Sequence, residues 1–102
     1  MDKKYTTIHY HSYLELDKIL SAQKMRSAAL EENPAHEEML FIIVHQVYEL
    51  WFKQILHELE SVVTLFGDDR TDERNLGIVN NRLDRVKEIL KLIIQQIRVL
   101  ET

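Results

Sequence analysis

The chain has 102 residues, 45% of them hydrophobic and 29% charged, and a net charge of −4, which is the composition of one small globular domain. Its Lys and Arg residues alternate with Asp and Glu, and its longest apolar run, residues 39–44, is far below the ~20 residues of a membrane span, so neither a nucleic-acid nor a membrane partner is expected. The absence of cysteine excludes disulfides and thiolate chemistry and is compatible with the cytoplasm, the location expected here.

The N-terminal third predicts an arm, a short helix and a loop. Residues 1–11 show no clear period and no apolar stretch behind the lysines, so they do not resemble a secretory signal. Ser12 and Glu15 have the spacing of a capping box, and helically spaced apolar residues follow, which predicts a short helix over 12–23. Residues 24–33 lack a period and are predicted to form a loop.

The middle of the chain predicts a long helix over 34–66. Asn33 is a good N-cap, Pro34 suits the first helical position, and Glu37 and Glu38 in the first turn favour the helix dipole. Gly67 is a typical helix stop.

The last third predicts a second long helix over 71–101, capped by Thr71 or Asp69. Its apolar residues alternate at spacings of three and four, the pattern of a seam that packs on another helix. They are Leu76, Val79, Leu83, Val86, Leu90, Ile93 and Ile97. With only two glycines and one proline, residues 1–102 are predicted to form a single all-α segment of one short and two long antiparallel helices.

The helix predicted over 34–66 has more apolar surface than this chain can cover. Nineteen of residues 35–66 are apolar, and a helix that is apolar over most of its circumference is buried on most sides. One short and one long companion cannot cover it, so partners are expected from other subunits, from more of the same polypeptide, or from both. From the residues alone, the chain is therefore predicted to be part of a larger helical bundle or oligomer. They indicate a non-catalytic, self-associating module and do not by themselves indicate an enzyme activity.

Three groups of residues are candidates for chemistry. His45 lies in the apolar helix near Phe41 and Tyr48, where it could orient a hydrogen bond to a ligand or simply bond to Glu49 or a backbone carbonyl. Tyr10 and Tyr13 could line a pocket or anchor the N-terminal arm.

A metal site is the third candidate. His57 and Glu60 have a spacing that could place two ligands on one metal, and so do His45 and Glu49. The Glu-x-x-His pairs of di-iron bundles are absent, so a solvated or interface face explains His57 and Glu60 better.

Four stretches of the chain resemble one family. Residues 40–59, LFIIVHQVYELWFKQILHEL, are similar to the hallmark helix of tryptophan 2,3-dioxygenases, and residues 10–23, YHSYLELDKILSAQ, resemble the segment that precedes it. Residues 72–75 and 95–102 resemble further family stretches, and 24–35 corresponds to a variable loop.

The resemblance implies an all-α homotetrameric oxidoreductase of tryptophan catabolism, in the kynurenine pathway. Such an enzyme uses a ferrous b-type haem to insert O₂ into the indole ring of L-tryptophan, giving N-formylkynurenine. By the resemblance, His45 is the distal histidine that faces the indole N–H, and Phe41 lies against the substrate. Tyr10, Tyr13 and Leu14 correspond to residues that enter a neighbouring subunit's pocket.

The resemblance also implies that part of the site lies outside these residues. The histidine that ligates the haem iron and the arginine that pairs with the substrate carboxylate belong to later stretches of the family sequence. None of the other histidines, His9, His11, His36 and His57, matches an iron ligand. This chain alone is therefore expected to hold no metal and no haem and to be inactive, since axial ligation comes from the other face of the haem.

Overall fold

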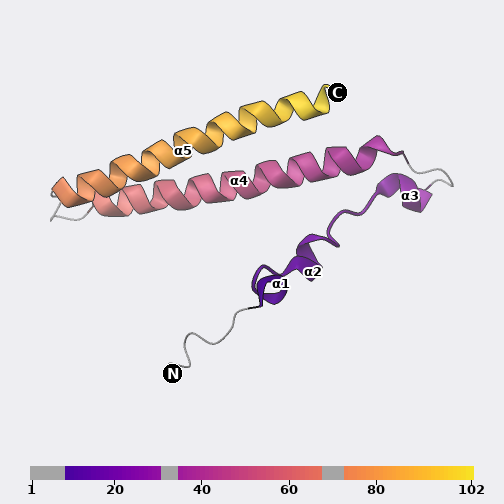
Figure 1. Cartoon of the computed structure of the whole chain (residues 1–102), viewed down its shortest axis with the longest axis horizontal. Helices are drawn as coiled ribbons and strands as arrows, with labels where there is room; N and C mark the ends of the chain where they lie inside the picture. Colours follow the sequence, from indigo (N-terminus) through magenta and orange to yellow (C-terminus); the bar gives the residue numbers. More distant parts are fainter. Residues whose placement is uncertain (1–8, 31–34, 68–72) are drawn as a thin grey trace. The chain divides into compact units, whose positions relative to one another are not determined.

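The computed structural model describes residues 9–30, 35–67 and 73–102, and all regular structure in these ranges is α-helical (Figure 1). The helices are α1 (Tyr10–Tyr13), α2 (Leu16–Ile19), α3 (Arg26–Leu30), α4 (Glu37–Phe66) and α5 (Glu73–Leu100). The predicted all-α class is confirmed. The chain divides into two compact units, Met1–Met39 and Leu40–Thr102, which are described separately.

In the first unit, the prediction of one continuous helix over 12–23 is wrong. Glu15 adopts the left-handed conformation, with φ 52° and ψ 45°, and this separates α1 from α2. The predicted capping box is wrong as well, because Ser12 lies inside α1 and its hydroxyl donates to the His9 carbonyl, while the Glu15 carboxylate binds Lys18 Nζ at 2.7 Å. Helices of four residues are marginal without packing, and neither buries a residue in this structure.

The predicted loop over 24–33 is also partly wrong, because it contains α3. The carboxylate of Glu38 accepts hydrogen bonds from the amides of Arg26 and Ser27, at 3.0 Å each, and from the Ser27 hydroxyl. It thereby satisfies two amides at the N-terminus of α3, which have no partner within the helix. These hydrogen bonds, above all those from Ser27, lower the pKa of Glu38. A cap contributed from eleven residues downstream gives no local sequence signal.

Helix α4 begins at Glu37, three residues later than predicted, and ends at Phe66 as predicted. Glu37 and Glu38 do lie in its first turn, and the Gly67 amide donates to the Val63 carbonyl at 3.0 Å, although Gly67 does not take a positive φ. The caps predicted at Asn33, Asp69 and Thr71 lie outside the described residues, as does Pro34 itself. No helix in the three described ranges combines the length and apolar composition of a membrane span.

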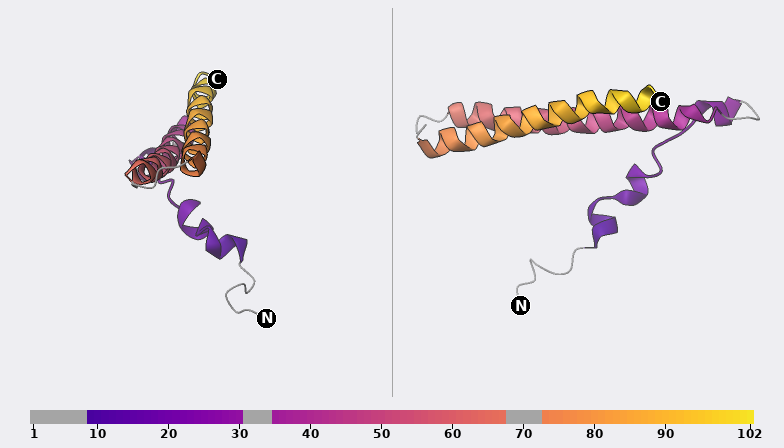
Figure 2. Two further views of the ribbon diagram at one scale, coloured as in Figure 1. Left: turned by 90° about the vertical axis from the view of Figure 1, so that its left-hand side faces the viewer. Right: turned by 45° about the horizontal axis from the view of Figure 1, so that its top comes forward.

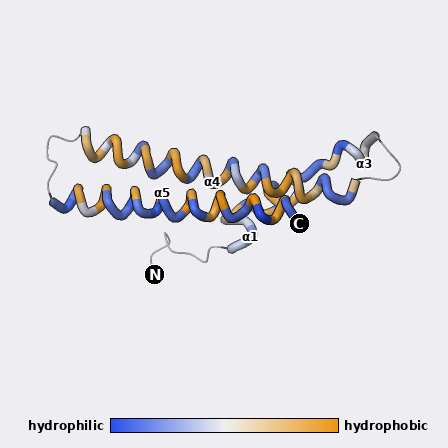
Figure 3. The backbone as a smooth tube through the Cα atoms, turned by 90° about the horizontal axis from the view of Figure 1, so that it is seen from above, coloured by the Kyte–Doolittle hydropathy of each residue, from blue (hydrophilic) through white to orange (hydrophobic). Residues whose placement is uncertain are grey.

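In the second unit, α4 and α5 lie side by side and run antiparallel, as Figure 1 and the right-hand view of Figure 2 show. Apolar positions recur along the whole length of both helices (Figure 3). The buried core between them is thin, and its apolar members are Val44, Val62, Val79, Val86 and Ile89. No side chain in the described ranges is completely buried, so this pairing covers a narrow strip of each helix.

The seam predicted on α5 is only half used by α4. Val79 and Val86 are buried, whereas the residues at every seventh position from Leu76 remain 41% to 47% exposed. These are Leu76, Leu83, Leu90 and Ile97. One row of the seam therefore packs on α4, and the other lies open beside it.

One buried carboxylate joins the two helices. Glu58 of α4, whose side chain is only 5% exposed, accepts hydrogen bonds from Gln54 Nε2 at 2.8 Å and from Arg85 Nη1 of α5 at 2.9 Å. The bond from Arg85, followed by that from Gln54, lowers the pKa of Glu58 despite the opposing effect of burial. A charge buried with two donors is stable in the ionised form, and it fixes how the helices align along their length.

The hairpin is therefore expected to lose stability in acid. Because the pKa of Glu58 is lowered on folding, its contribution is present above the ordinary carboxylate pKa of 4.5 and is lost as the pH falls through the lower folded value. Replacing Glu58 by Gln keeps the shape but removes the charge, and we expect it to lower the free energy of unfolding at pH 7 by about 1–3 kcal/mol. Thermal unfolding followed by circular dichroism from pH 7 to pH 3 measures both effects.

Asp84→Asn is the matched control, since Asp84 lies 3.8 Å from Lys87 in an exposed pair on α5. This change should leave both the midpoint and its pH dependence nearly as in the wild type. A Glu58→Gln variant with the wild-type acid dependence would contradict the assignment.

Candidate functional site

Four rings follow one another along one face of α4, at residues 41, 45, 48 and 52. The ring centroids of Phe41 and His45 are 4.2 Å apart, and those of His45 and Tyr48 are 6.2 Å apart in an edge-on arrangement. Tyr48 and Phe52 are stacked with centroids 6.3 Å apart. Spacings of three and four place these rings on one side of the helix, which we call the aromatic face.

His45 is held by the backbone of its own helix. Its Nδ1 lies 2.7 Å from the carbonyl oxygen of Phe41, one turn earlier. A carbonyl oxygen only accepts, so Nδ1 carries the proton, and in the neutral ring Nε2 is a hydrogen-bond acceptor. Of the two partners considered from the sequence, the backbone carbonyl is the one observed. His45 is exposed, so Nε2 can meet a ligand.

Tyr48 and Phe52 extend the site beyond the residues singled out from the sequence. The sequence pattern placed Tyr48 only beside His45 and assigned no role to Phe52. Tyr48 follows His45 by three residues, and Phe52 follows Tyr48 by four. This helical spacing is the signal that could have identified both. Phe41 and Phe52 remain 58% and 42% exposed, so the aromatic face is open in this chain.

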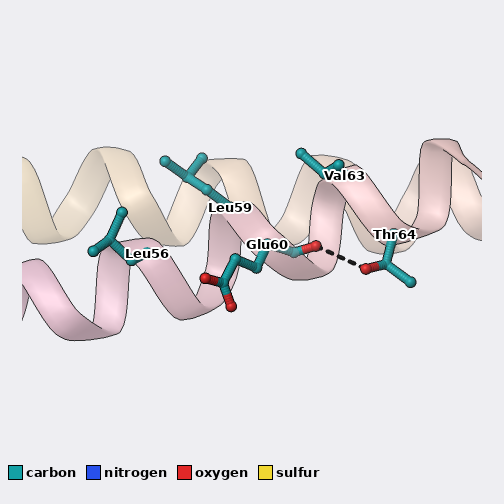
Figure 4. A pocket seen from close by; sticks show the side chains of 5 residues that line it. All are labelled: Leu56, Leu59, Glu60, Val63 and Thr64. Atoms are coloured by element: carbon teal, nitrogen blue, oxygen red, sulfur yellow. Dashed lines mark hydrogen bonds between the residues drawn. The ribbon is translucent and has the colours of Figure 1, made fainter.

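The aromatic face continues toward the C-terminus of α4 as a shallow groove. Leu56, Leu59 and Val63 line it together with Glu60 and Thr64 (Figure 4). The Thr64 hydroxyl donates to the Glu60 carbonyl at 3.0 Å, which turns this polar group toward the backbone (Figure 4). Val63 is 70% exposed, so the groove is an uncovered apolar surface rather than an enclosed pocket.

The N-terminal candidates belong to the other unit. Tyr10 and Tyr13 lie in α1 with 73% and 70% of their surfaces exposed, and Leu14 caps its C-terminal end. Neither α1 nor α2 contains a buried residue. Within the second unit the structure brings Phe41 and His45 together, and within the first unit it leaves Tyr10, Tyr13 and Leu14 exposed.

No metal centre is formed by the described residues, among which no three His, Cys, Asp or Glu side chains cluster. His57 and Glu60 are both exposed on α4, and the carboxylate next to them, Glu58, is engaged by Gln54 and Arg85. The metal-binding alternative therefore gains no support from the geometry.

The fold and the site together define a class: an all-α segment that presents one oriented histidine from an open aromatic wall. The family model described as tryptophan 2,3-dioxygenase matches residues 2–102, and the chain belongs to that family. A tryptophan 2,3-dioxygenase of Bdellovibrio bacteriovorus is 54% identical over 97% of the chain, one of Rattus norvegicus is 53% identical over 91%, and one of Dictyostelium discoideum is 50% identical over 93%.

The chain spans only about a quarter of the length of these relatives: 27%, 23% and 24%, respectively. It therefore corresponds to one segment of a longer enzyme. This agrees with the surplus apolar surface of α4, which a single helical partner leaves open.

Proposed function

We propose that this chain forms the substrate-facing wall of the pocket of a haem-dependent tryptophan 2,3-dioxygenase. The complete protein oxidises L-tryptophan with O₂ to N-formylkynurenine, in the kynurenine pathway of the cytoplasm. The observation that carries the proposal is the bond from His45 Nδ1 to the Phe41 carbonyl, because it leaves Nε2 as an acceptor on an aromatic surface. An indole N–H is a donor attached to an aromatic ring and complements such a surface.

Each candidate residue has a part in this proposal. His45 Nε2 accepts the hydrogen bond from the indole N–H and so orients the ring, while Phe41 packs against the indole. Tyr10, Tyr13 and Leu14 enter the pocket of a neighbouring subunit in a homotetramer. Their exposure within their own unit supports this assignment, since an apolar group left uncovered is stabilised by a partner.

The residues present fit one wall of a haem pocket and do not fit the ligation of its iron. Haem, when bound, supplies the iron that activates O₂. In this proposal His45 bonds to the substrate and not to the iron. The described part of the chain holds no cluster of metal-ligating side chains. This chain therefore orients the substrate, and it is proposed to be inactive by itself.

A haem titration of the purified chain tests this division of roles. We expect no stoichiometric complex and no change in Soret absorbance on adding L-tryptophan, because an axial ligand is missing. A stable, tryptophan-sensitive complex would show that a histidine here ligates the iron, and the assignment of His45 to the substrate would be wrong.

The role of His45 itself is tested in an active enzyme. In a chimera, residues 1–102 replace the matching segment of the Bdellovibrio relative. We expect His45→Ala to lower kcat/KM by about fivefold to a hundredfold, since it leaves the indole N–H of the substrate without an acceptor, which costs about 1–3 kcal/mol. The Soret spectrum should be retained.

His57→Ala is the control, because His57 is exposed on a different side of α4 from His45. It should change neither activity nor haem content. Loss of haem in the His45→Ala chimera, with haem retained in His57→Ala, would contradict the proposed role.

A second function, a non-catalytic self-associating module, is favoured by the open groove on α4. Leu56 and Val63 are 59% and 70% exposed, and exposed apolar surface of this kind drives association in water. Such association is compatible with the first proposal, since both require a cover for the same helix.

The isolated chain is accordingly expected to elute as an oligomer in size-exclusion chromatography with light scattering. Val63→Lys places a charge in the groove and should shift the equilibrium toward monomer. Thr64→Lys, at the next position and on the polar side of the groove, should not. A stable wild-type monomer at micromolar concentration would exclude the self-associating module.

A further inference from the structure

The imidazole of His45 lies between two aromatic rings of its own helix. The Phe41 ring is inclined to it by 32° on the side toward the N-terminus, and the Tyr48 ring meets it at 78° on the side toward the C-terminus. Rings in contact on both sides restrict rotation of the imidazole about its bond to the Cβ atom. The orientation of His45 is therefore set by its neighbours as well as by its hydrogen bond.

That orientation decides whether Nε2 meets a ligand as an acceptor. A half-turn of the ring would place carbon where Nδ1 now lies and would break the 2.7 Å bond to the Phe41 carbonyl. Nδ1 would then no longer be held as the donor, and the proton could move to Nε2. A ring with the proton on Nε2 donates where the substrate also donates, so it cannot accept from an indole N–H.

Tyr48 is itself firmly placed. Its ring stacks on Phe52, and its hydroxyl oxygen is buried with no hydrogen-bond partner in the described ranges. Within these ranges the phenol ring makes the contact with His45, and the hydroxyl bonds to nothing. Phenylalanine at this position should therefore preserve the arrangement, whereas a side chain without a ring should not.

We propose that Tyr48 is a positioning residue, whose ring holds His45 in the state with the proton on Nδ1 and Nε2 open as an acceptor. This proposal rests on the proposed function in one respect only, namely that Nε2 of His45 accepts a hydrogen bond from the substrate. The geometry of the aromatic face carries the rest, and it can be tested without haem or tryptophan.

The test is the ring ¹⁵N spectrum of the whole 102-residue chain at a pH where His45 is neutral. The wild type is expected to show His45 mainly with the proton on Nδ1, and Tyr48→Phe should retain this state. Tyr48→Leu should raise the ratio of the Nε2-protonated to the Nδ1-protonated form several-fold. Tyr48→Met, which keeps apolar volume without a ring, should do the same and replaces the leucine variant if that one loses helicity by circular dichroism.

His57 of the same helix and the variant Phe66→Leu supply the controls. His57 has no ring contact with Tyr48, so its tautomer ratio should not change in any variant. Phe66→Leu removes an aromatic ring two turns beyond His57 and should leave His45 unchanged. If neither Tyr48→Leu nor Tyr48→Met alters the tautomer ratio of His45, the positioning role is overturned.

The same variants in the chimeric enzyme separate this inference from the function proposed above. Under both proposals, kcat/KM falls several-fold in Tyr48→Leu and is retained in Tyr48→Phe. A changed tautomer ratio with unchanged activity would uphold the positioning of His45 and contradict its role toward the substrate.

Discussion

Helix α4 has more apolar surface than any single neighbour can cover, and the rest of the structure follows from this. Its partner α5 buries a strip that contains Val44 and Val62 and leaves the opposite flank, from Phe41 to Phe66, open to solvent. A helix of 30 residues in water is stable only when an apolar face is covered, so the hairpin is a unit that remains to be completed. An uncovered apolar face is what we expect of a segment that spans about a quarter of the length of related enzymes.

Within the hairpin, polar groups set the alignment and apolar groups provide the attraction. The five buried aliphatic residues could slide along one another by a turn at little cost, because all are of similar size. Glu58 removes this freedom, since its buried charge is bonded to Arg85 of α5. On the open side of α4, His45 likewise has few contacts: its Nδ1 bonds to one backbone carbonyl, and its ring contacts two flanking rings.

The long elements could be predicted because their signals are periodic and extend over many residues. The end of α4 at Phe66 follows from the sequence alone, and α5 ends at Leu100, one residue before the predicted end. The short elements could not be predicted: the helix expected over 12–23 breaks at Glu15, and α3 forms where a loop was expected. Four or five residues contain too few positions for a period, and the cap of α3 is Glu38, which is distant in sequence.

For the site, the sequence by itself determined that an apolar helix carries His45 one turn after Phe41, because residues four apart on a helix must be neighbours. The tertiary structure alone decided which half of the α5 seam is covered and that Glu58 is buried against Arg85, since both depend on how two helices meet. Within α4, the structure also shows that His45 bonds to the Phe41 carbonyl rather than to Glu49, because residue spacing does not determine the side-chain rotamer.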